Sequence, residues 1–214
     1  MLTLFRPTAG QISEFLKRTQ EASYTYDHIG ATRREALPHG FDHDHHQVLL
    51  GRGQEVFQLA TNALQTWKMI PASMAEVVDP APVEVGQVVG LLFRTPACWS
   101  VSPCRVVYIL DDESCDEQNQ HWRRFAFGNG TLPGHVEAGE ERFQVAWNLD
   151  SNEVWYSITA FSKPNMWLVK LGYLYARRQQ ARFRKLSGQA MQQVVASVDD
   201  SASSLSTNGA TTAE

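Results

Sequence analysis

Cysteine is scarce in this chain, and the cysteines that occur form no recognisable pattern. There are three cysteines, Cys98, Cys104 and Cys115, and no two of them have the C-x-x-C spacing. A disulfide framework or a zinc knuckle needs paired cysteines at short, regular spacings. The sequence therefore argues against a disulfide-stapled scaffold and indicates a reducing, cytoplasmic location.

Long apolar runs and an excess of basic charge are also lacking. No stretch reaches the roughly 18–20 apolar residues of a membrane-spanning helix, so we expect no integral membrane segment. Residues 1–7 lack the basic region and long apolar core of a secretory signal. The net charge is −4, with 19 Lys and Arg against 23 Asp and Glu, whereas nucleic-acid binders usually carry a strong basic excess. We therefore expect no nucleic-acid partner.

Cofactor and metal motifs are missing too. Gly51, Arg52 and Gly53 precede a helix, but they complete neither a phosphate-binding loop nor a dinucleotide fingerprint. Residues 39–46 hold four histidines and two aspartates, which are metal-ligating types, but their spacing matches no defined site. We interpret them as a polar loop that leads into a strand, and we predict no cofactor and no metal.

Three stretches have the apolar spacing of helices. Thr8 and Gln11 form a capping box ahead of a short stripe at Ile12, Phe15 and Leu16. A clearer stripe spans residues 56–67, and the longest spans about 165–195. We therefore expect a short first helix, a second helix and a long C-terminal helix.

Between the second and third helices the apolar pattern has a period of two. The alternation, or a short β-branched apolar run, recurs several times, and Gly, Pro, Asn or Asp turns separate the segments without an intervening helix. The segments are residues 87–94, 105–110, 123–127, 143–147 and 154–161. We expect one antiparallel sheet from about 75 to 161, an additional short strand at 48–50, and an acidic loop at 111–120.

This order of elements predicts an α+β fold. An apolar sheet face and an apolar helix stripe must be buried against each other, which favours a curved antiparallel sheet wrapped around the C-terminal helix, with a cavity between them. We assign residues 1–196 to a single domain. Residues 197–214 are rich in Ser, Thr and Ala, and we expect them to form a disordered tail.

Five segments together resemble uncharacterised protein family UPF0548, and the resemblance extends over about residues 5–195. They are residues 24–32, 50–53, 103–108, 130–143 and 160–164, of which 130–143 reads Gly-Thr-Leu-Pro-Gly-His-Val-Glu-Ala-Gly-Glu-Glu-Arg-Phe. The family has no established function, so this resemblance implies no activity. The strand–helix order is also similar to the START-related (SRPBCC) helix-grip folds. That architectural resemblance implies an apolar ligand held between sheet and helix.

The segment 130–143 is the sharpest candidate site, because it gathers a histidine and three glutamates in a turn rich in Gly and Pro. A histidine beside carboxylates can shuttle protons. We predict acid/base roles for His135, Glu137 and Glu140, and ligand contacts for Tyr24, Arg105, Thr131 and Glu141. The alternative is a structural hairpin, with its glycines at special dihedral angles and its carboxylates solvated or paired with Arg142.

Three functions stay open at this point. The first is binding of a small, mainly apolar or amphipathic ligand, and the second is an enzyme that uses His135 with Glu137 or Glu140 in the same cavity. The third is an interaction protein that uses a basic side of the C-terminal helix. That side consists of Lys170, Arg177, Arg178, Arg182, Arg184 and Lys185. Oligomeric state does not follow from the sequence.

Overall fold

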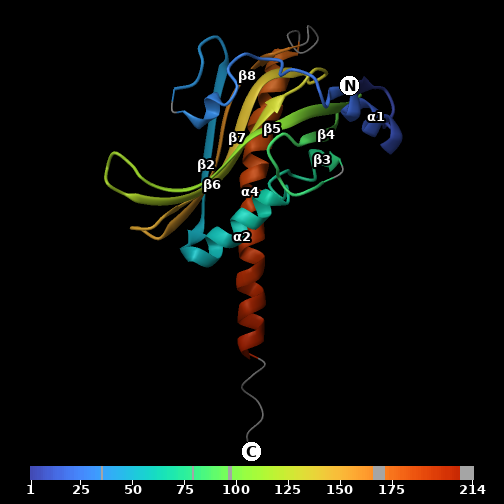
Figure 1. The fold of residues 1–214 in the computed structure, drawn as a ribbon. Coiled ribbons are helices and arrows are strands. Elements are labelled where there is room, and N and C mark those ends of the chain that lie inside the picture. The colour runs from blue at the N-terminus through green and yellow to red at the C-terminus, as the bar shows by residue number, and fades with distance from the viewer. Residues whose placement is uncertain (35, 79, 96–97, 166–171, 208–214) are drawn as a thin grey trace, which may run out of the picture.

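The computed structural model describes residues 1–207 except 35, 79, 96–97 and 166–171, with side chains described as far as residue 197. A long curved sheet and a C-terminal helix dominate it (Figure 1). All strand pairs are antiparallel, and the spatial order is β2-β8-β7-β6-β5-β4-β3, with β1 paired to β5. The strands are β1 (Leu2–Thr3), β2 (Asp42–Arg52), β3 (Ala75–Val78), β4 (Val88–Arg94), β5 (Trp99–Cys115), β6 (His121–Thr131), β7 (Glu137–Asn148) and β8 (Glu153–Pro164).

Helices lie around this sheet where the apolar stripes predicted them. Helix α1 (Ala9–Thr19) begins at the predicted capping box, in which the side chains of Thr8 and Gln11 bond reciprocally. A 3-10 turn, η1 (Ala31–Arg33), precedes β2. Helix α2 (Gly53–Gln65) follows β2, and α4 (Tyr173–Thr207) closes the described chain. The structure thus has the predicted helix-grip arrangement, in which the last helix lies along the curved sheet (Figure 1).

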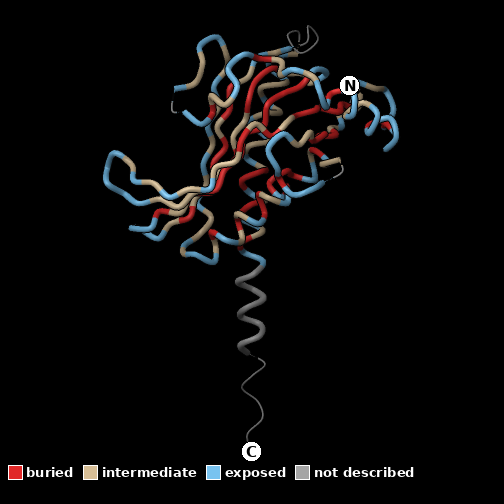
Figure 2. Tube along the Cα trace, in the orientation of Figure 1, coloured by how far each residue is buried: buried red, intermediate tan, exposed pale blue. Residues whose placement is uncertain are grey.

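The main core fills the space between the inner face of the sheet, α2 and α4. Cross-strand partners share a face, so one row of side chains on the inner face is His46, Ile158, Phe143 and Phe127. These phenylalanines belong to a cluster that includes Leu64 of α2 and Met191 of α4. Figure 2 shows the buried residues concentrated where the sheet and the two helices meet. Burial of this apolar surface holds α4 against the sheet.

The outer face of the sheet has its own cover, the irregular segment 20–41. Tyr26 is 5 % exposed and sets its ring edge against Phe161 of β8, with centroids 5.6 Å apart. Phe41 packs on the other side of Phe161 at 5.1 Å. This cover packs on β7 and β8, while α1 lies against β4 and β5. Side chains on both faces of β7 and β8 are therefore enclosed by other parts of the chain, so a binding site could form on either face.

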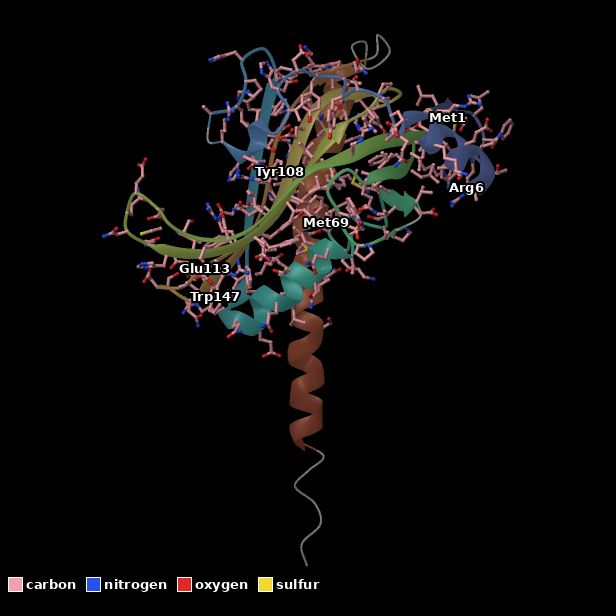
Figure 3. The ribbon with its side chains drawn as sticks, viewed as in Figure 1. Met1, Arg6, Met69, Tyr108, Glu113 and Trp147 are labelled. Atoms are coloured by element: carbon pink, nitrogen blue, oxygen red, sulfur yellow. The ribbon has the colours of Figure 1, made fainter. Side chains whose placement is uncertain are left out.

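Two segments predicted as loops are strands. The expected strand at 48–50 extends over Asp42–Arg52, so most of the histidine cluster lies in β2 rather than in a polar loop. The expected acidic loop at 111–120 is largely the end of β5, where Asp112 pairs with Arg124 of β6 at 3.0 Å. In this hairpin Glu113, Arg123 and Trp147 share one cross-strand row, of which Figure 3 labels the outer two. Cross-strand ion pairs stabilise these polar strand ends.

The C-terminal boundaries also differ from the expectation. The helix expected from about 165 begins at Tyr173, and residues 166–171 lie outside the described part of the chain. It extends to Thr207, past the expected start of the tail at 197. The assignment of 1–196 to one domain and 197–214 to a disordered tail stays a prediction.

Candidate functional site

Glu140 lies on the outer face and fixes the cover segment to the sheet. Its side chain is 2 % exposed. Oε2 accepts bonds from the Tyr26 hydroxyl at 2.8 Å and the Gly30 amide at 2.7 Å. Oε1 accepts from the Thr32 amide at 2.9 Å and from the Thr32 hydroxyl. A buried carboxylate that accepts four hydrogen bonds has used its acceptor sites. Glu140 is therefore a structural anchor between the cover segment and the sheet.

Close approach of chain segments explains two glycines of the 130–143 motif. A Cβ on Gly130 would lie 2.3 Å from the Tyr26 hydroxyl and 2.8 Å from the Tyr24 ring. A Cβ on Gly139 would lie 2.0 Å from the main-chain oxygen of Phe161. Only glycine fits at either position without displacing its neighbour. Part of the motif therefore encodes packing of the cover segment and of β8.

Arg105 and Tyr24 also lie on the outer side, beside the end of α1. The Arg105 guanidinium donates to the carbonyl of Thr19 at 3.1 Å and to that of Gln20, and it lies 5.3 Å from the centroid of the Tyr24 ring. A cation at a helix C-terminus satisfies carbonyls that have no helical partner. Burial raises the pKa of Tyr24, while Arg105 opposes that rise. Arg105 thus stabilises the end of α1.

His135 lies in the turn between β6 and β7. Its Nδ1 lies 3.0 Å from both the main-chain nitrogen and the carbonyl oxygen of Glu137, and in the tautomer with the proton on Nε2 it accepts from that N–H. Burial lowers the pKa of His135 to about 4. Thr131, at the start of the turn, accepts from the Gly139 amide at 3.0 Å. Both side chains therefore shape the turn, and His135 is neutral at physiological pH.

We expect His135→Ala to lower the free energy of unfolding by about 1–3 kcal/mol at pH 7, because the buried Glu137 N–H loses its acceptor. The lowered pKa adds a pH effect, since the unfolded chain binds a proton that the folded chain rejects. Stability from His135 is complete above about pH 6.5 and is lost as the pH falls towards 4. Urea unfolding at pH 7 and pH 5 measures both effects.

The exposed His43→Ala serves as the control for that experiment and should change neither value. Unchanged stability of His135→Ala, combined with loss of a bound ligand, would instead assign His135 to a functional site.

A second group of polar side chains lies on the inner face, against the first half of α4. Asp44 of β2 is 9 % exposed at its side chain and pairs with Arg177 at 2.6 Å and Arg184 at 2.9 Å. Glu137 accepts a hydrogen bond from Gln180 of the same helix. Burial raises the pKa of Glu137 against the opposing effects of Gln180 and Arg177. These contacts hold α4 to the sheet edge formed by β2, β8 and β7.

Two members of this inner group lack hydrogen-bond partners. Asp44, Ala160, Glu141 and Asn129 form one row across four strands. Asn129 is 5 % exposed, and its Oδ1 has no partner among the described residues. The Glu141 carboxyl makes no side-chain hydrogen bond to the described part of the chain, and burial raises its pKa to about 8 although Arg184 lies close. Buried polar atoms are almost always bonded, so the Asn129 oxygen, together with the half-buried Glu141 carboxyl in its row, is a candidate ligand contact.

Cys104 pairs with Thr131 in the next inner row, and its thiol is unreactive. Cys104 is 6 % exposed and belongs to the main apolar cluster. Burial raises the pKa of the thiol to about 12, and the neighbouring Glu141 adds to the rise. A nucleophilic cysteine needs a lowered pKa, so the thiol acts as a small apolar group.

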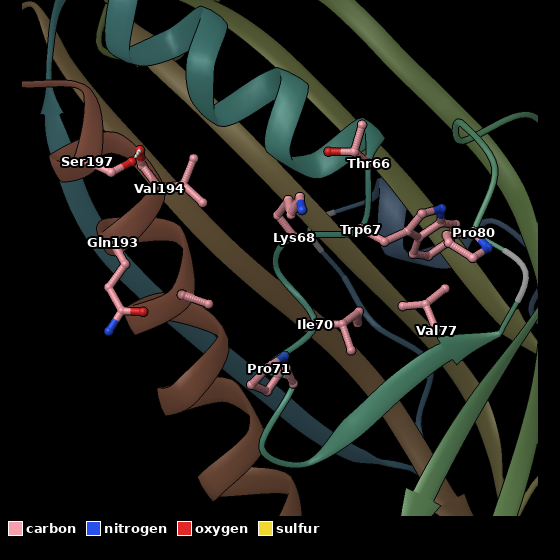
Figure 4. Close-up of a pocket in the computed structure, with 12 residues that line it drawn as sticks. Thr66, Trp67, Lys68, Ile70, Pro71, Val77, Pro80, Gln193, Val194 and Ser197 are labelled. Atoms are coloured by element: carbon pink, nitrogen blue, oxygen red, sulfur yellow. Dashed lines mark hydrogen bonds between the residues drawn. The ribbon is translucent and has the colours of Figure 1, made fainter. Parts of the chain in front are cut away.

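An apolar groove of about 510 Å³ opens between the sheet edge at β3 and the second half of α4 (Figure 4). Ile70 and Pro71 line one wall with Val77 of β3, and α4 supplies Ala190 and Val194 to the other. Figure 4 shows Lys68 and Gln193 at the same hollow. The groove is large enough for a small organic molecule, since ligand sites span about 300–1,000 Å³.

Trp67 forms the inner end of this groove in an unusual backbone conformation. Its φ is 61°, and it follows α2 at the position where a helix commonly ends in glycine. The Trp67 amide bonds to Leu64 and that of Lys68 to Ala63, which are the two bonds of a Schellman cap. The indole is 3 % exposed, donates to the Ala81 carbonyl at 2.8 Å and packs on Phe127. A tryptophan held at positive φ carries a backbone cost of about 1–3 kcal/mol, which its packing offsets.

The predicted site residues thus separate into three places. Glu140, Tyr24 and Arg105 lie on the outer face, Glu137 and Glu141 lie on the inner face, and Thr131 and His135 shape the turn between them. The sheet itself separates the outer-face residues from those on the inner face. The sequence reasoning missed Asp44, Asn129 and Trp67, because their proximity depends on strand register and on a helix cap.

The described residues were also compared with the requirements of a metal site and of a membrane-spanning helix. Within the described ranges, no group of three or more His, Cys, Asp or Glu side chains could hold a metal ion. The histidines of β2 divide between the two faces, with His43 and His45 exposed on one side and His46 turned inward on the other. None of the helices in the described part of the chain is long and apolar enough to cross a membrane.

Comparison with known proteins gives the family. The model of a domain of unknown function, DUF1990, matches residues 25–190. The chain belongs to the DUF1990 family. This DUF1990 protein is 36 % identical to the UPF0548 protein of Arabidopsis thaliana, over 87 % of this chain and 93 % of the relative. It is 30 % identical to a UPF0548 protein of Dictyostelium discoideum, over 86 % of this chain and 90 % of the relative. The predicted family is therefore confirmed.

Among solved structures, the DUF1990 chain is similar to a hypothetical protein from Helicobacter pylori. The TM-score is 0.48 and the sequence identity 13 %, and the match covers 81 % of this chain and 97 % of the other.

Proposed function

We propose that this protein binds a small, mainly apolar ligand between the sheet and α4, in the groove beside Trp67. The observation that carries the proposal is the apolar groove of about 510 Å³ between β3 and α4. Apolar hollows of this size with a few polar groups at the edge are typical small-molecule sites. The proposal retains the cytoplasmic location, because Cys98, Cys104 and Cys115 are unpaired.

Chemistry at the groove favours an amphipathic molecule. The walls are Ile70, Pro71, Val77 and Val194, which offer no hydrogen bonds from their side chains. The ammonium of Lys68 is exposed at the same hollow and suits a polar or acidic end group. An apolar body with one polar end would fill the groove and keep its polar end near solvent.

Filling the groove tests the proposal. We expect Ala190→Phe to weaken binding of the neutral fluorescent probe 1-N-phenylnaphthylamine at least about tenfold, since a phenyl ring would occupy the volume that the probe needs. The matched control is Ala181→Phe, the same change at an exposed position of the same helix. Native mass spectrometry of both variants would show whether a co-purifying molecule is lost in parallel.

Equal probe binding by both variants would contradict the proposal, and so would absence of both probe binding and a co-purifying molecule in the unmodified protein. Circular dichroism confirms that each variant keeps its helix content, so that a loss of binding is not a loss of fold.

A second candidate function, acid/base catalysis, draws support from Glu141 rather than from Glu140. A carboxyl whose pKa is raised to about 8 is a proton donor near neutral pH, as catalytic acids are. Glu137 is the second inner-face carboxyl with a raised pKa. The predicted acid/base role of Glu137 fits this place, while Glu140 is taken up by the cover segment and His135 by the turn.

The third function, an interaction through a basic side of α4, draws less support. Arg177 and Arg184 pair with Asp44 against the sheet, so they do not belong to an exposed basic surface. Arg178, Arg182 and Lys185 are exposed, and Lys170 lies outside the described residues. A solvated helix face accounts for three exposed cations.

A further inference from the structure

A second hollow of about 390 Å³ lies on the outer face, and its lining is mostly polar and basic, unlike that of the apolar groove. Its walls come from β2, β7, β8 and the loop before β2. The lining side chains are basic, hydroxylic or apolar, apart from one aspartate: Arg34, Leu37, His43, Asp44, His45, Arg142 and Thr159. Asp44 does not neutralise the hollow, because its carboxylate is engaged by Arg177 and Arg184.

Arg142 is the centre of this hollow. His45, Thr159 and Arg142 form one cross-strand row on the outer face of β2, β8 and β7. The Arg142 Nη2 reaches only the Thr159 hydroxyl, at 3.4 Å, and its buried Nε has no partner among the described residues. Arg142 makes no ion pair with the described carboxylates, and burial lowers its pKa. A half-buried arginine that lines a hollow and has an unpaired donor is costly unless an anion completes its contacts.

The surroundings add positive charge and no free carboxylate of a described residue. Arg34 lines the hollow, and the Arg33 guanidinium lies 4.2 Å from the centroid of the Tyr108 ring, which shares a cross-strand row with Arg142. His45 Nδ1 lies 3.2 Å from the Thr159 hydroxyl, so both can turn towards a ligand oxygen. The nearest outer-face carboxylate in the next row, Glu140, accepts its four bonds from the cover segment.

We propose that this hollow is a binding site for a small molecule with an oxyanionic group, held by Arg142, Thr159 and His45. The planar guanidinium offers donors to two oxygens of one phosphate or carboxylate, the hydroxyl donates to a third contact, and Leu37 supplies an apolar wall for the rest of the molecule. The site lies on the face opposite the apolar groove, so the two proposals are independent.

Titration calorimetry with inorganic phosphate and, separately, with acetate tests the site at constant ionic strength, so that screening does not imitate binding. We expect one equivalent of an anion to bind, and Arg142→Gln to weaken that binding at least about tenfold through loss of a charge-assisted bidentate contact. Arg52→Gln, which removes an arginine paired with Glu153 at the sheet edge, should bind as the unmodified protein does. Tighter phosphate than acetate assigns a phosphate group, and the reverse assigns a carboxylate.

Several results would overturn the proposal. The proposal is contradicted if the unmodified protein binds neither phosphate nor acetate. It is also contradicted if Arg142→Gln binds them as well as the unmodified protein does. The anion-free Arg142→Gln protein should be at least as stable as the unmodified protein, because the buried donor is unpaired. If Arg142→Gln instead lowers stability in the absence of any anion, the guanidinium is already satisfied within the chain, and the proposal fails. Thr159→Val, expected to weaken anion binding while leaving Arg142 in place, provides the second variant.

Discussion

Glu140→Ala is expected to lower the free energy of unfolding by about 3–5 kcal/mol, the range for removing one partner from a buried charged network. The carboxylate accepts from Tyr26, Gly30 and from two donors of Thr32. Alanine removes the acceptor of the Tyr26 hydroxyl and of the two amides, while the Thr32 hydroxyl keeps the Tyr108 hydroxyl as a partner at 2.7 Å. Such a loss is a large part of the roughly 5–15 kcal/mol that stabilises a domain. Urea denaturation followed by tryptophan fluorescence measures it.

The neighbouring residue provides the matched control. Glu141→Ala changes the same residue type one position along β7, but it removes a carboxyl that makes no side-chain hydrogen bond to the described residues. We expect that variant to lose far less stability. Tyr26→Phe, which removes a single bond, should cost about 1 kcal/mol and be non-additive with Glu140→Gln. Equal losses from Glu140→Ala and Glu141→Ala would contradict the assignment of Glu140 as the anchor.

Apolar periodicity was sufficient to predict most of the sheet and the grip of the helix. The segments 105–110, 123–127 and 143–147 lie within β5, β6 and β7, because there the side chains alternate between the core and the outer face. The extensions of β2 and β5 could not be predicted in this way, since they alternate among polar residues. Asp44 and Asp112 find their cations on α4 and β6 respectively, and such pairs become visible only when the register is known.

The sequence identified several residues of the candidate site but not which of them lie together, and the reason is geometric. Consecutive strand residues point to opposite faces, so Glu140 and Glu141 cannot enter one cavity once both belong to β7. The sequence placed them in a turn, where that restriction does not apply. Asn129 was beyond sequence reasoning, because its position beside Glu141 requires the exact pairing of β6 with β7. Trp67 was read as part of the helical stripe, although its positive φ places it in the cap after α2.

Glu141 should make the protein less stable as the pH rises from about 5 to about 8. Its pKa is about 8 in the folded protein and about 4.5 in the unfolded chain. Between these values the folded protein keeps a proton that the unfolded chain has released, so the free energy of unfolding falls with pH. The limiting slope for one proton is about 1.4 kcal/mol per pH unit. Urea unfolding at pH 5, 6, 7 and 8 measures the slope.

Glu141→Gln should remove the Glu141 part of this slope, because the amide keeps the shape of the protonated carboxyl and does not ionise. Glu137, whose pKa is also raised, contributes a slope of the same sign that remains in the variant. Glu55→Gln, an exposed glutamate in the first turn of α2, should leave it in place. His135 changes the free energy of unfolding with pH in the opposite direction, and it does so mainly below pH 6.5. Because His135 is present in both variants, the difference between their slopes comes from Glu141. If Glu141→Gln retains the full slope, then the carboxyl is ionised at neutral pH, and its use as a proton donor loses its basis. If the Glu141 part of the slope disappears, the inner face holds a neutral acid beside the unpaired Asn129 amide. A ligand that accepts a hydrogen bond from this acid would then bind the unmodified protein more weakly as the pH approaches 8, whereas its binding to Glu141→Gln would not change with pH.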